Sequence, residues 1–294
     1  MASACETSTC AVWIASRVII VFSIGLAGCV VNGIVIKIYR KAAKKPHEQT
    51  GSQLYMVTLA WIDLLGCLLL LPQYPLWELG ILPHVIFSTH GVLQTQSYLF
   101  VQVAMTFDRV FAVFRPLHYK QMRRRTNIVS IVLFIVQQLT IHVSRIIKFH
   151  FVDNVVPQYI YVTSFITGLI IMLVSYPAIA INLYRQSRRV QQAPATDTAH
   201  SRIVSESQER TKYHVKTMRI YIAVLVLFLA TLIPPTIITI SMADVQYQWV
   251  GYLYYINNIG NPLIYYAFND KFRAQVNAML RSIVTKSQTT KHTC

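Results

Sequence analysis

Long apolar runs alternate with short polar and basic segments along the whole chain. A run of about 20 apolar residues is long enough to cross a bilayer as a helix, whereas a membrane strand needs only about 10. The first and sixth runs are plainly apolar, and the third, fourth and seventh are more polar and are assigned partly from their context. The pattern predicts an all-α membrane protein, a bundle of seven transmembrane helices. The predicted spans are 13–38, 53–76, 85–114, 127–148, 158–184, 217–242 and 247–268.

Two polar stretches complete the predicted domain organisation. Residues 186–212 are rich in Ser, Thr, Gln and charge and show no apolar period, which predicts a flexible loop. In residues 269–284, apolar residues at helical spacing alternate with Lys and Arg, which predicts a short amphipathic helix on the inner membrane surface. The chain is therefore expected to comprise a short N-terminus at 1–12, a seven-helix domain at 13–268 and a tail at 269–294.

The basic residues give this arrangement an orientation. Of the 27 Lys and Arg residues, 24 lie in the segments 37–48, 109–125, 185–219 and 271–294, which share one side if the chain crosses seven times. Loops rich in Lys and Arg stay in the cytoplasm, so the N-terminus is expected outside, and the loop at 186–212 and the C-terminus inside. The net charge of +16 then reflects membrane topology and not nucleic-acid binding, and a chain that is 54% hydrophobic and 13% charged is not an ordinary soluble protein.

A few polar side chains lie inside the predicted spans, where hydrocarbon penalises them and where they mark function by default. They are Asn32, Asp63, Asp108, Arg109, Asn257, Asn258 and Asn261. Amides hydrogen-bond across helix bundles, which would explain the asparagines as contacts between helices. A buried carboxylate needs more, because Asp63 must keep a cation, take up a proton or lie in a polar cage.

Four stretches in order, "VVNGIV", "LAWIDLL", "TFDRVFAVFRPLHY" and "NPLIYYAF", resemble the rhodopsin-like (class A) G-protein-coupled receptors. The resemblance covers residues 14–283, and although each motif alone is weak, the four together in the right spans are specific. It implies a plasma-membrane receptor in the lipid bilayer that binds an extracellular ligand and activates a heterotrimeric G protein. Neither enzymatic activity nor a cofactor is expected. The resemblance also implies that arrestin and a receptor kinase act on the Ser/Thr-rich cytoplasmic segments.

The resemblance also assigns roles to individual residues. Asn32, Asp63 and Asn261 would form a buried polar network, with Asn257 nearby and Tyr98 replacing a serine that helps to hold sodium under the aspartate. At rest, Asp108 would hold Arg109, which turns toward the G protein and Tyr176 on activation. The residues implied in G-protein coupling and activation are Asp108, Arg109, Pro116, Leu117, Tyr176, Phe228, Pro234, Asn261, Pro262 and Tyr265.

Several positions depart from the family pattern. His84 stands where the family has a cysteine that is disulfide-bonded to the second outer loop, and Leu232 replaces the tryptophan of the sixth helix. Gly168 replaces the usual proline of the fifth helix. Because Tyr98 fills part of the usual ion space, we expect Asp63 to be protonated or hydrogen-bonded, and not to hold sodium tightly.

The predicted ligand pocket is a mildly polar, tyrosine-rich cup. Gly91 replaces the aspartate of amine receptors, so a monoamine is not expected, and Tyr255 replaces the lysine of opsins, which excludes retinal bound as a Schiff base. A peptide or a neutral small molecule fits the cup better than a charged metabolite. Each tyrosine in the cup is as readily a packing residue as a ligand contact. The candidate lining residues are Gly91, Thr95, Tyr161, Ser164, Leu232, Thr236, Tyr247, Gly251 and Tyr255.

Two other functions remain open at this level. A receptor-like scaffold that does not signal would explain the missing cysteine and tryptophan, but not the intact Asp108–Arg109 pair. A transporter or channel would show internal repeats, paired broken helices or rings of charge, and the sequence shows none of these.

Overall fold

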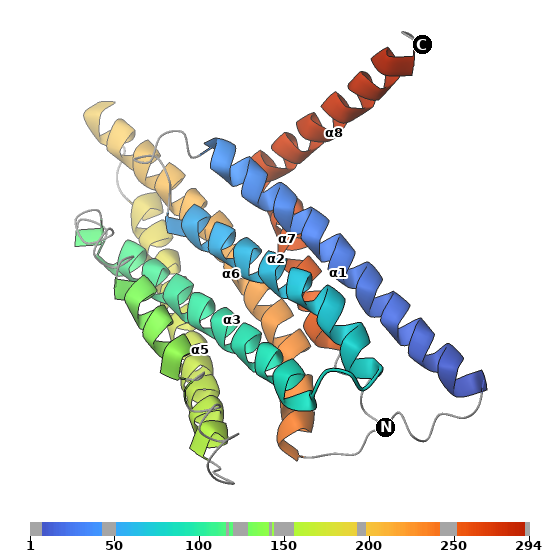
Figure 1. Ribbon diagram of the computed structural model, residues 1–294. Coiled ribbons are helices and arrows are strands. Elements are labelled where there is room, and N and C mark those ends of the chain that lie inside the picture. The colour runs from blue at the N-terminus through green and yellow to red at the C-terminus, as the bar shows by residue number, and fades with distance from the viewer. Residues whose placement is uncertain are drawn as a thin grey trace. The chain divides into compact units, whose positions relative to one another are not determined.

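The structure, a computed structural model, consists of helices and short connections in the part of the chain that it describes (Figure 1). It describes residues 8–42, 51–115, 118–119, 129–140, 143, 156–192, 198–241 and 252–291. The helices are α1 (Ser8–Ala42), α2 (Gly51–Glu78), α3 (His84–Phe114), α5 (Val156–Gln192), α6 (Thr198–Ser241), α7 (Tyr252–Phe268) and α8 (Asp270–Lys291), with a shorter apolar helix at Val129–Thr140.

Five of these helices are long and apolar enough to cross a membrane, which confirms the all-α membrane class. Their apolar windows are Ala11–Arg40, Gln53–Glu78, Thr89–Phe114, Val162–Gln186 and Val215–Ile237. The fourth predicted span is described only as Val129–Thr140, and the seventh begins in residues outside the described part and continues as α7, which has 17 residues. These two remain predictions as full spans.

The described chain falls into two compact units. The first contains residues 1–83 and 220–294, and therefore α1, α2, α7, α8 and α6 from Ile220 onward. In it α1 lies against α2 and α7, and α8 lies against α7 and α1 (Figure 1). The second contains residues 84–219, in which α3 lies against α5.

Glycine allows close approach of α1 and α2 in the first unit. A Cβ atom at Gly28 would lie 2.4 Å from the sulfur of Cys67, and one at Gly25 would lie 2.9 Å from Leu71 Cδ2. Helices in a membrane gain stability chiefly from such close packing of small residues, since lipid is as apolar as the helices themselves. By contrast, a Cβ atom at Gly33 would meet nothing within 4 Å.

Local sequence signals explain where α2 ends and α8 begins. Gly80 adopts a φ of 72° and its amide bonds to the carbonyl of Trp77, which closes the C-terminus of α2 as glycine commonly does. At α8, the Asn269 side chain accepts a hydrogen bond from the amide of Phe272 at 3.2 Å, the contact of a helix N-cap.

A glycine has a comparable packing role in the second unit. A Cβ atom at Gly168 of α5 would lie 2.6 Å from Leu99 Cδ1 of α3. The departure from the family's proline therefore has a local physical consequence, because it lets α5 approach α3 closely. On another side of α3, the rings of Phe100 and Phe134 lie 5.2 Å apart and connect this helix to Val129–Thr140.

The structure corrects the prediction of a flexible loop at 186–212. The helix α5 continues to Gln192 and α6 begins at Thr198, so the only residues of this segment outside the described part are 193–197. Within the helical parts, Gln and Arg make up eight of the 22 residues, and both have good helix propensity even where no apolar face is present. The one proline of the segment, Pro194, falls between the two helices.

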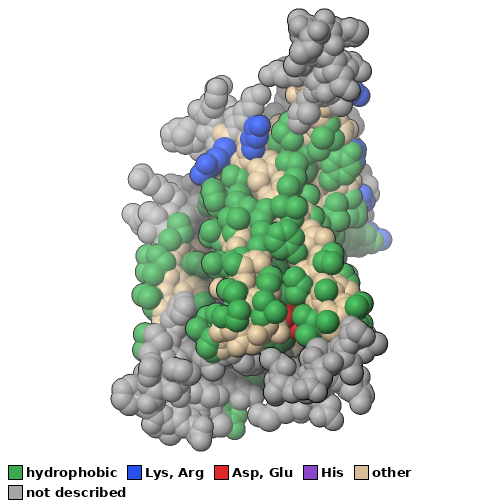
Figure 2. Space-filling model, turned by 45° about the vertical axis from the view of Figure 1, so that its right-hand side comes forward, with side chains coloured by type: hydrophobic (Ala, Val, Ile, Leu, Met, Phe, Trp, Pro, Cys, Tyr) green, Lys and Arg blue, Asp and Glu red, His purple; other side chains and the backbone are tan. Residues whose placement is uncertain are grey.

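The surface of the described helices is strongly apolar. Figure 2 shows hydrophobic side chains over most of the face in view, with lysine and arginine side chains in its upper half. The α1 helix alone exposes Ile19, Ile20, Phe22, Leu26 and Val30. A soluble monomer rarely exposes so large an apolar area, whereas a membrane helix presents it to lipid.

Candidate functional site

The buried carboxylate of α2 contacts the asparagine that precedes the α7 proline. Asn261 donates its Nδ2 to Asp63 Oδ2 at 3.1 Å, and the two residues are 2% and 0% exposed. The structure thus brings together two of the three residues expected in the polar network. An amide donor suits a carboxylate oxygen, and it meets part of the cost of burying this acid.

The third residue, Asn32 of α1, satisfies the backbone of α7. Its Nδ2 donates to the carbonyl of Asn258 at 2.7 Å and to the carbonyl of Gly28 at 2.9 Å. Asn258 is four residues before Pro262, and proline has no N–H to donate to that carbonyl. The side chain of Asn32 therefore replaces the helical hydrogen bond that Pro262 removes, which explains why asparagine and proline occur together here.

Asn257 connects α7 to α6. Its Oδ1 accepts a hydrogen bond from Thr231 Oγ1 at 3.3 Å, and the same hydroxyl donates to the carbonyl of Leu227 at 2.7 Å. Thr231 was not among the residues singled out from the sequence, because one threonine in an apolar helix gives no signal by itself. The polar residues of α7 thus reach three neighbouring helices of the first unit, α1, α2 and α6.

Several buried polar atoms in this network have no hydrogen-bond partner among the described residues. They are Asn32 Oδ1, Asn257 Nδ2, Asn261 Oδ1 and the hydroxyl of Tyr265. The Tyr265 ring packs edge-on against Phe272 of α8, with centroids 6.3 Å apart. Phe272 in turn stacks on Tyr39 of α1 at 5.8 Å, so the inner end of α7 is held by aromatic contacts and not by a bond from Tyr265.

The contact between Asp63 and Asn261 bears on the expectation that Asp63 does not hold sodium tightly, which stays a prediction. The Asn261 atom facing the carboxylate is an amide nitrogen, whereas a hard cation takes oxygen ligands. Tyr98 belongs to the second unit, where its hydroxyl accepts a hydrogen bond from Gln94 at 3.0 Å. Its expected place beside Asp63 stays a prediction.

The second unit contains a buried ion pair at the end of α3. Arg109 Nη2 lies 2.6 Å from Asp108 Oδ2, and both residues are 3% exposed. Tyr119 donates its hydroxyl to the other oxygen, Asp108 Oδ1, at 2.6 Å. The sequence predicted the ion pair, and Tyr119, the last residue of the quoted motif TFDRVFAVFRPLHY, was not assigned a role.

The remaining residues expected in coupling are divided between the two units. Tyr176 of α5 is buried in the second unit near Arg109 and Thr106. In the first unit Phe228 and Pro262 are buried and Pro234 is partly exposed. Pro116 and Leu117 lie outside the described residues.

The candidate ligand residues are also divided. Thr95 and Ser164 belong to the second unit, where Ser164 Oγ donates to the buried Oε1 of Gln96 at 3.1 Å. In the first unit Thr236 shares a hydrogen bond of 3.4 Å with Tyr254. Of the other candidates, Gly91 is exposed, Leu232 is buried and Tyr255 is partly buried. Tyr247, Gly251 and the side chain of Tyr161 lie outside the described part.

Gln96 is a buried residue that the sequence reasoning missed. It accepts from Ser164 and also from Gln137 Nε2 at 3.1 Å, and so connects α3, α5 and Val129–Thr140 through one amide oxygen. Glutamine inside a predicted span carries the same signal as asparagine, since both amides are costly in hydrocarbon. A search for all amides in the spans, and not only asparagines, would have found it.

Comparison with protein families identifies the chain. A family model described as "7 transmembrane receptor (rhodopsin family)" matches residues 31–265, which include α2, α3, α5, α6 and the polar part of α7. A comparison with curated proteins gives no match. The matched region contains both the α7 polar network and the ion pair of α3. The chain therefore belongs to the rhodopsin family of seven-transmembrane receptors.

Proposed function

We propose that this protein is a receptor that binds an extracellular ligand and activates a heterotrimeric G protein. The observation that carries the proposal is the buried pair of Asp108 and Arg109 at the end of α3. An arginine in such a place is costly unless a partner neutralises it, and the cost is justified if the arginine is released for another partner in an active state. Tyr119 strengthens the resting arrangement through its bond to Asp108.

The α7 network supports the same function. Proline weakens a helix where it removes a hydrogen bond, and here one side chain, Asn32, replaces that bond. A helix held by a few polar contacts can adopt a second arrangement that a ligand favours by binding it more tightly. We infer that the inner part of α7, with Tyr265, changes position between the resting and active receptor.

We further propose a plasma-membrane receptor with seven spans, its N-terminus outside and its C-terminus inside. The distribution of Lys and Arg supports this topology. In this arrangement α8 lies on the inner membrane surface, and the Ser/Thr-rich cytoplasmic segments are where arrestin and a receptor kinase would act. The ligand is a peptide or a neutral small molecule that binds among the candidate pocket residues. Catalytic activity is not expected.

The test of coupling is the substitution Arg109→Ala. We expect surface expression to be retained and G-protein activation, both basal and ligand-driven, to fall to background across several G-protein sensors. Arg273→Ala is the matched control, because Arg273 makes an exposed ion pair with Asp270 of α8 and should signal normally. Normal signalling by Arg109→Ala would instead favour the scaffold that does not signal.

A second variant tests the resting pair itself. Tyr119→Phe removes one hydrogen bond from Asp108 without removing a ring, and we expect it to raise basal signalling at equal surface expression. Unchanged basal signalling would show that Tyr119 does not contribute to the resting state.

A further inference from the structure

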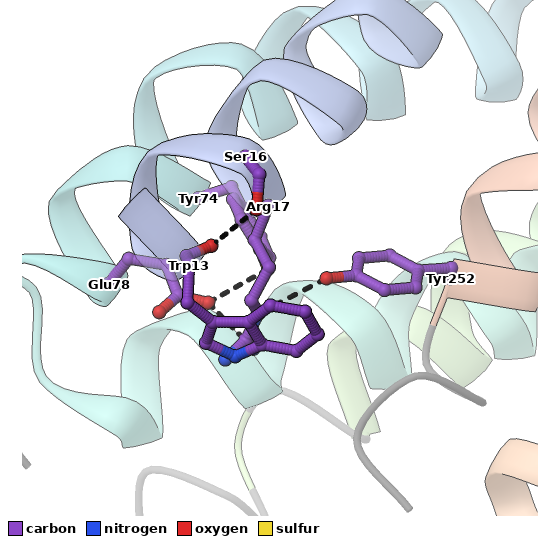
Figure 3. Close-up of polar contacts among 6 residues, drawn as sticks. All are labelled: Trp13, Ser16, Arg17, Tyr74, Glu78 and Tyr252. Atoms are coloured by element: carbon purple, nitrogen blue, oxygen red, sulfur yellow. Dashed lines mark hydrogen bonds and ion pairs between the residues drawn. The ribbon is translucent and has the colours of Figure 1, made fainter. Parts of the chain in front are cut away.

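A partly buried ion pair lies in the first unit, near the start of α1, the end of α2 and the start of α7 (Figure 3). Arg17 Nη2 lies 2.7 Å from Glu78 Oε1, and the two side chains are 13% and 8% exposed. Tyr74 donates its hydroxyl to the same oxygen at 2.8 Å, and Arg17 Nε donates to the hydroxyl of Tyr252 at 3.1 Å. One guanidinium group therefore connects three helices.

The surroundings of Glu78 attract a cation for reasons beyond its own charge. Glu78 is the last residue of α2, where the helix dipole is negative and a carboxylate is unfavourable unless a cation lies near. No basic residue of α2 itself lies in that last turn. The positive charge comes instead from α1, and Arg17 is one of only three Lys and Arg residues outside the four basic segments of the sequence.

The tyrosines that bond to the pair belong to a group of packed aromatic rings. The ring of Tyr74 lies 5.8 Å from that of Trp77 and meets the ring of Tyr255 edge-on at 5.9 Å. Tyr252 and Tyr255 lie 6.5 Å apart. The two tyrosines that bond to the pair, Tyr74 and Tyr252, are therefore held in place by ring contacts with their neighbours.

We propose that this cluster is a guanidinium-binding site that Arg17 fills in the structure, and that a ligand carrying a guanidinium group, such as an arginine side chain of a peptide, binds there in its place. The geometry selects guanidinium over a simple ammonium. Two nitrogens of one planar group meet two acceptors on different helices, Glu78 on α2 and Tyr252 on α7. An ammonium is a compact point charge and does not present donors in this fixed fork.

The proposal names the ligand chemistry for the receptor proposed above and so rests on that function. Arg17 is tethered and has a high effective concentration at the site, so a free guanidinium compound would not displace it. A peptide would need further contacts in the pocket to do so. The site itself can nevertheless be tested alone, by removing Arg17 and supplying the missing group from solution.

The experiment uses the full-length receptor with Arg17→Ala, purified in detergent, and measures the midpoint of thermal inactivation. The added compounds are ethylguanidinium and ethylammonium chloride at the same millimolar concentration. We expect ethylguanidinium to raise the midpoint by about 2–4 °C, in the range that ligand stabilisation of roughly 1 kcal/mol gives for a protein of this size, and ethylammonium to raise it by less than half as much.

Three controls define the site. The double variant Arg17→Ala/Glu78→Gln lacks the acceptor and should show no rise, and the wild type should show none because Arg17 occupies the site. Arg273→Ala removes an arginine from an exposed pair and should also show none. If Arg17→Ala does not yield folded receptor, its surface expression is measured in cells grown with either compound, and restoration by ethylguanidinium alone is the expected result.

Two results would overturn the proposal and leave the cluster as a contact between three helices. In the first, ethylguanidinium neither raises the midpoint nor restores the surface expression of Arg17→Ala. In the second, both compounds have the same effect, or all variants respond equally. The readout needs no G protein. A negative result here therefore leaves the Arg109 experiment unaffected, and a negative Arg109 experiment does not change the outcome here.

Discussion

Asn32 donates its side-chain amide to the main-chain carbonyl of Asn258, the acceptor that Pro262 leaves without a helical donor. The bond is 2.7 Å long and joins residues 226 positions apart in the sequence. A buried carbonyl without a partner costs about 1–3 kcal/mol, so this one contact allows a proline in the middle of α7. It also makes the stability of α7 depend on a residue of α1.

A double-mutant cycle tests this dependence. Asn32→Ala should lower stability by about 1–3 kcal/mol, measured as a lower midpoint of thermal inactivation, because it leaves the Asn258 carbonyl unpaired. In a Pro262→Ala background the new amide of residue 262 can bond to that carbonyl. The loss on Asn32→Ala should then shrink by at least about 1 kcal/mol. Equal losses in both backgrounds would show that Asn32 acts independently of the proline.

The close approach of α1 and α2 predicts different results for two glycines of one helix. Gly28→Ala would place a methyl group 2.4 Å from the sulfur of Cys67, and we expect it to destabilise the receptor by about 1–3 kcal/mol. Gly33→Ala is the matched control, because its methyl would meet nothing within 4 Å and should be neutral or stabilising by up to about 1 kcal/mol.

The cause of the Gly28→Ala effect can be checked in the same experiment. Adding Cys67→Ala removes the sulfur and should restore most of the lost stability. If the double variant is no more stable than Gly28→Ala, or if Gly33→Ala is equally harmful, then close packing at Cys67 is not the reason.

Much of this fold follows from the sequence because hydrocarbon imposes a simple rule on spans, and the rule acts on length and apolarity alone. The first, second, third, fifth and sixth spans are predicted and found as helices. The rule says nothing beyond the membrane, and so the helices that extend α5 to Gln192 and α6 back to Thr198 were missed. Their residues favour helix by propensity, without any apolar pattern.

The candidate site was predictable in part for the same reason. Asn32, Asp63 and Asn261 stand out because polar groups are rare in spans, and the structure brings Asp63 and Asn261 together. The partner of Asn32 was not predictable, because it is a backbone carbonyl and not a side chain. Arg17 and Glu78 lie near predicted span ends, where charge is common, so their burial as a pair could not be read from the sequence.

The predicted topology can be tested with two epitope tags on intact cells. A tag inserted after Met1 should be labelled without permeabilisation, because the N-terminus is expected outside. A tag inserted between residues 193 and 197, which separate α5 and α6, should be labelled only after permeabilisation. Labelling of the second tag on intact cells would reject the orientation derived from the basic residues.

The contact between Asp63 and Asn261 predicts how the buried carboxylate responds to substitution. Asp63→Asn keeps an oxygen that can accept the Asn261 amide, and should change stability by less than about 1 kcal/mol. Asp63→Leu leaves that amide unpaired and should cost about 1–3 kcal/mol. Both are compared as midpoints of thermal inactivation of the purified receptor.

The same receptor tests for sodium. Exchanging sodium chloride for the chloride of a large organic cation should leave the wild-type midpoint unchanged, since an amide nitrogen faces the carboxylate. A midpoint that rises with sodium in the wild type but not in Asp63→Asn would restore the sodium site implied by the family.

Tyr265 predicts a separation of stability from signalling. Its ring is fully buried against Phe272, but its hydroxyl has no hydrogen-bond partner among the described residues, and a buried hydroxyl without a partner is destabilising. Tyr265→Phe keeps the ring and removes only the hydroxyl, so the resting receptor should keep its thermal midpoint or gain up to about 1 kcal/mol. If the hydroxyl gains a partner only in the active state, the same variant should signal less at equal surface expression.

Tyr39→Phe is the contrasting variant. The Tyr39 hydroxyl accepts a hydrogen bond from Asn269 at 3.3 Å and donates one to Met56 at 3.3 Å, so its loss should lower the midpoint. A Tyr265→Phe receptor that is less stable than the wild type, or that signals at full strength, would show that the hydroxyl is satisfied at rest or is not used on activation.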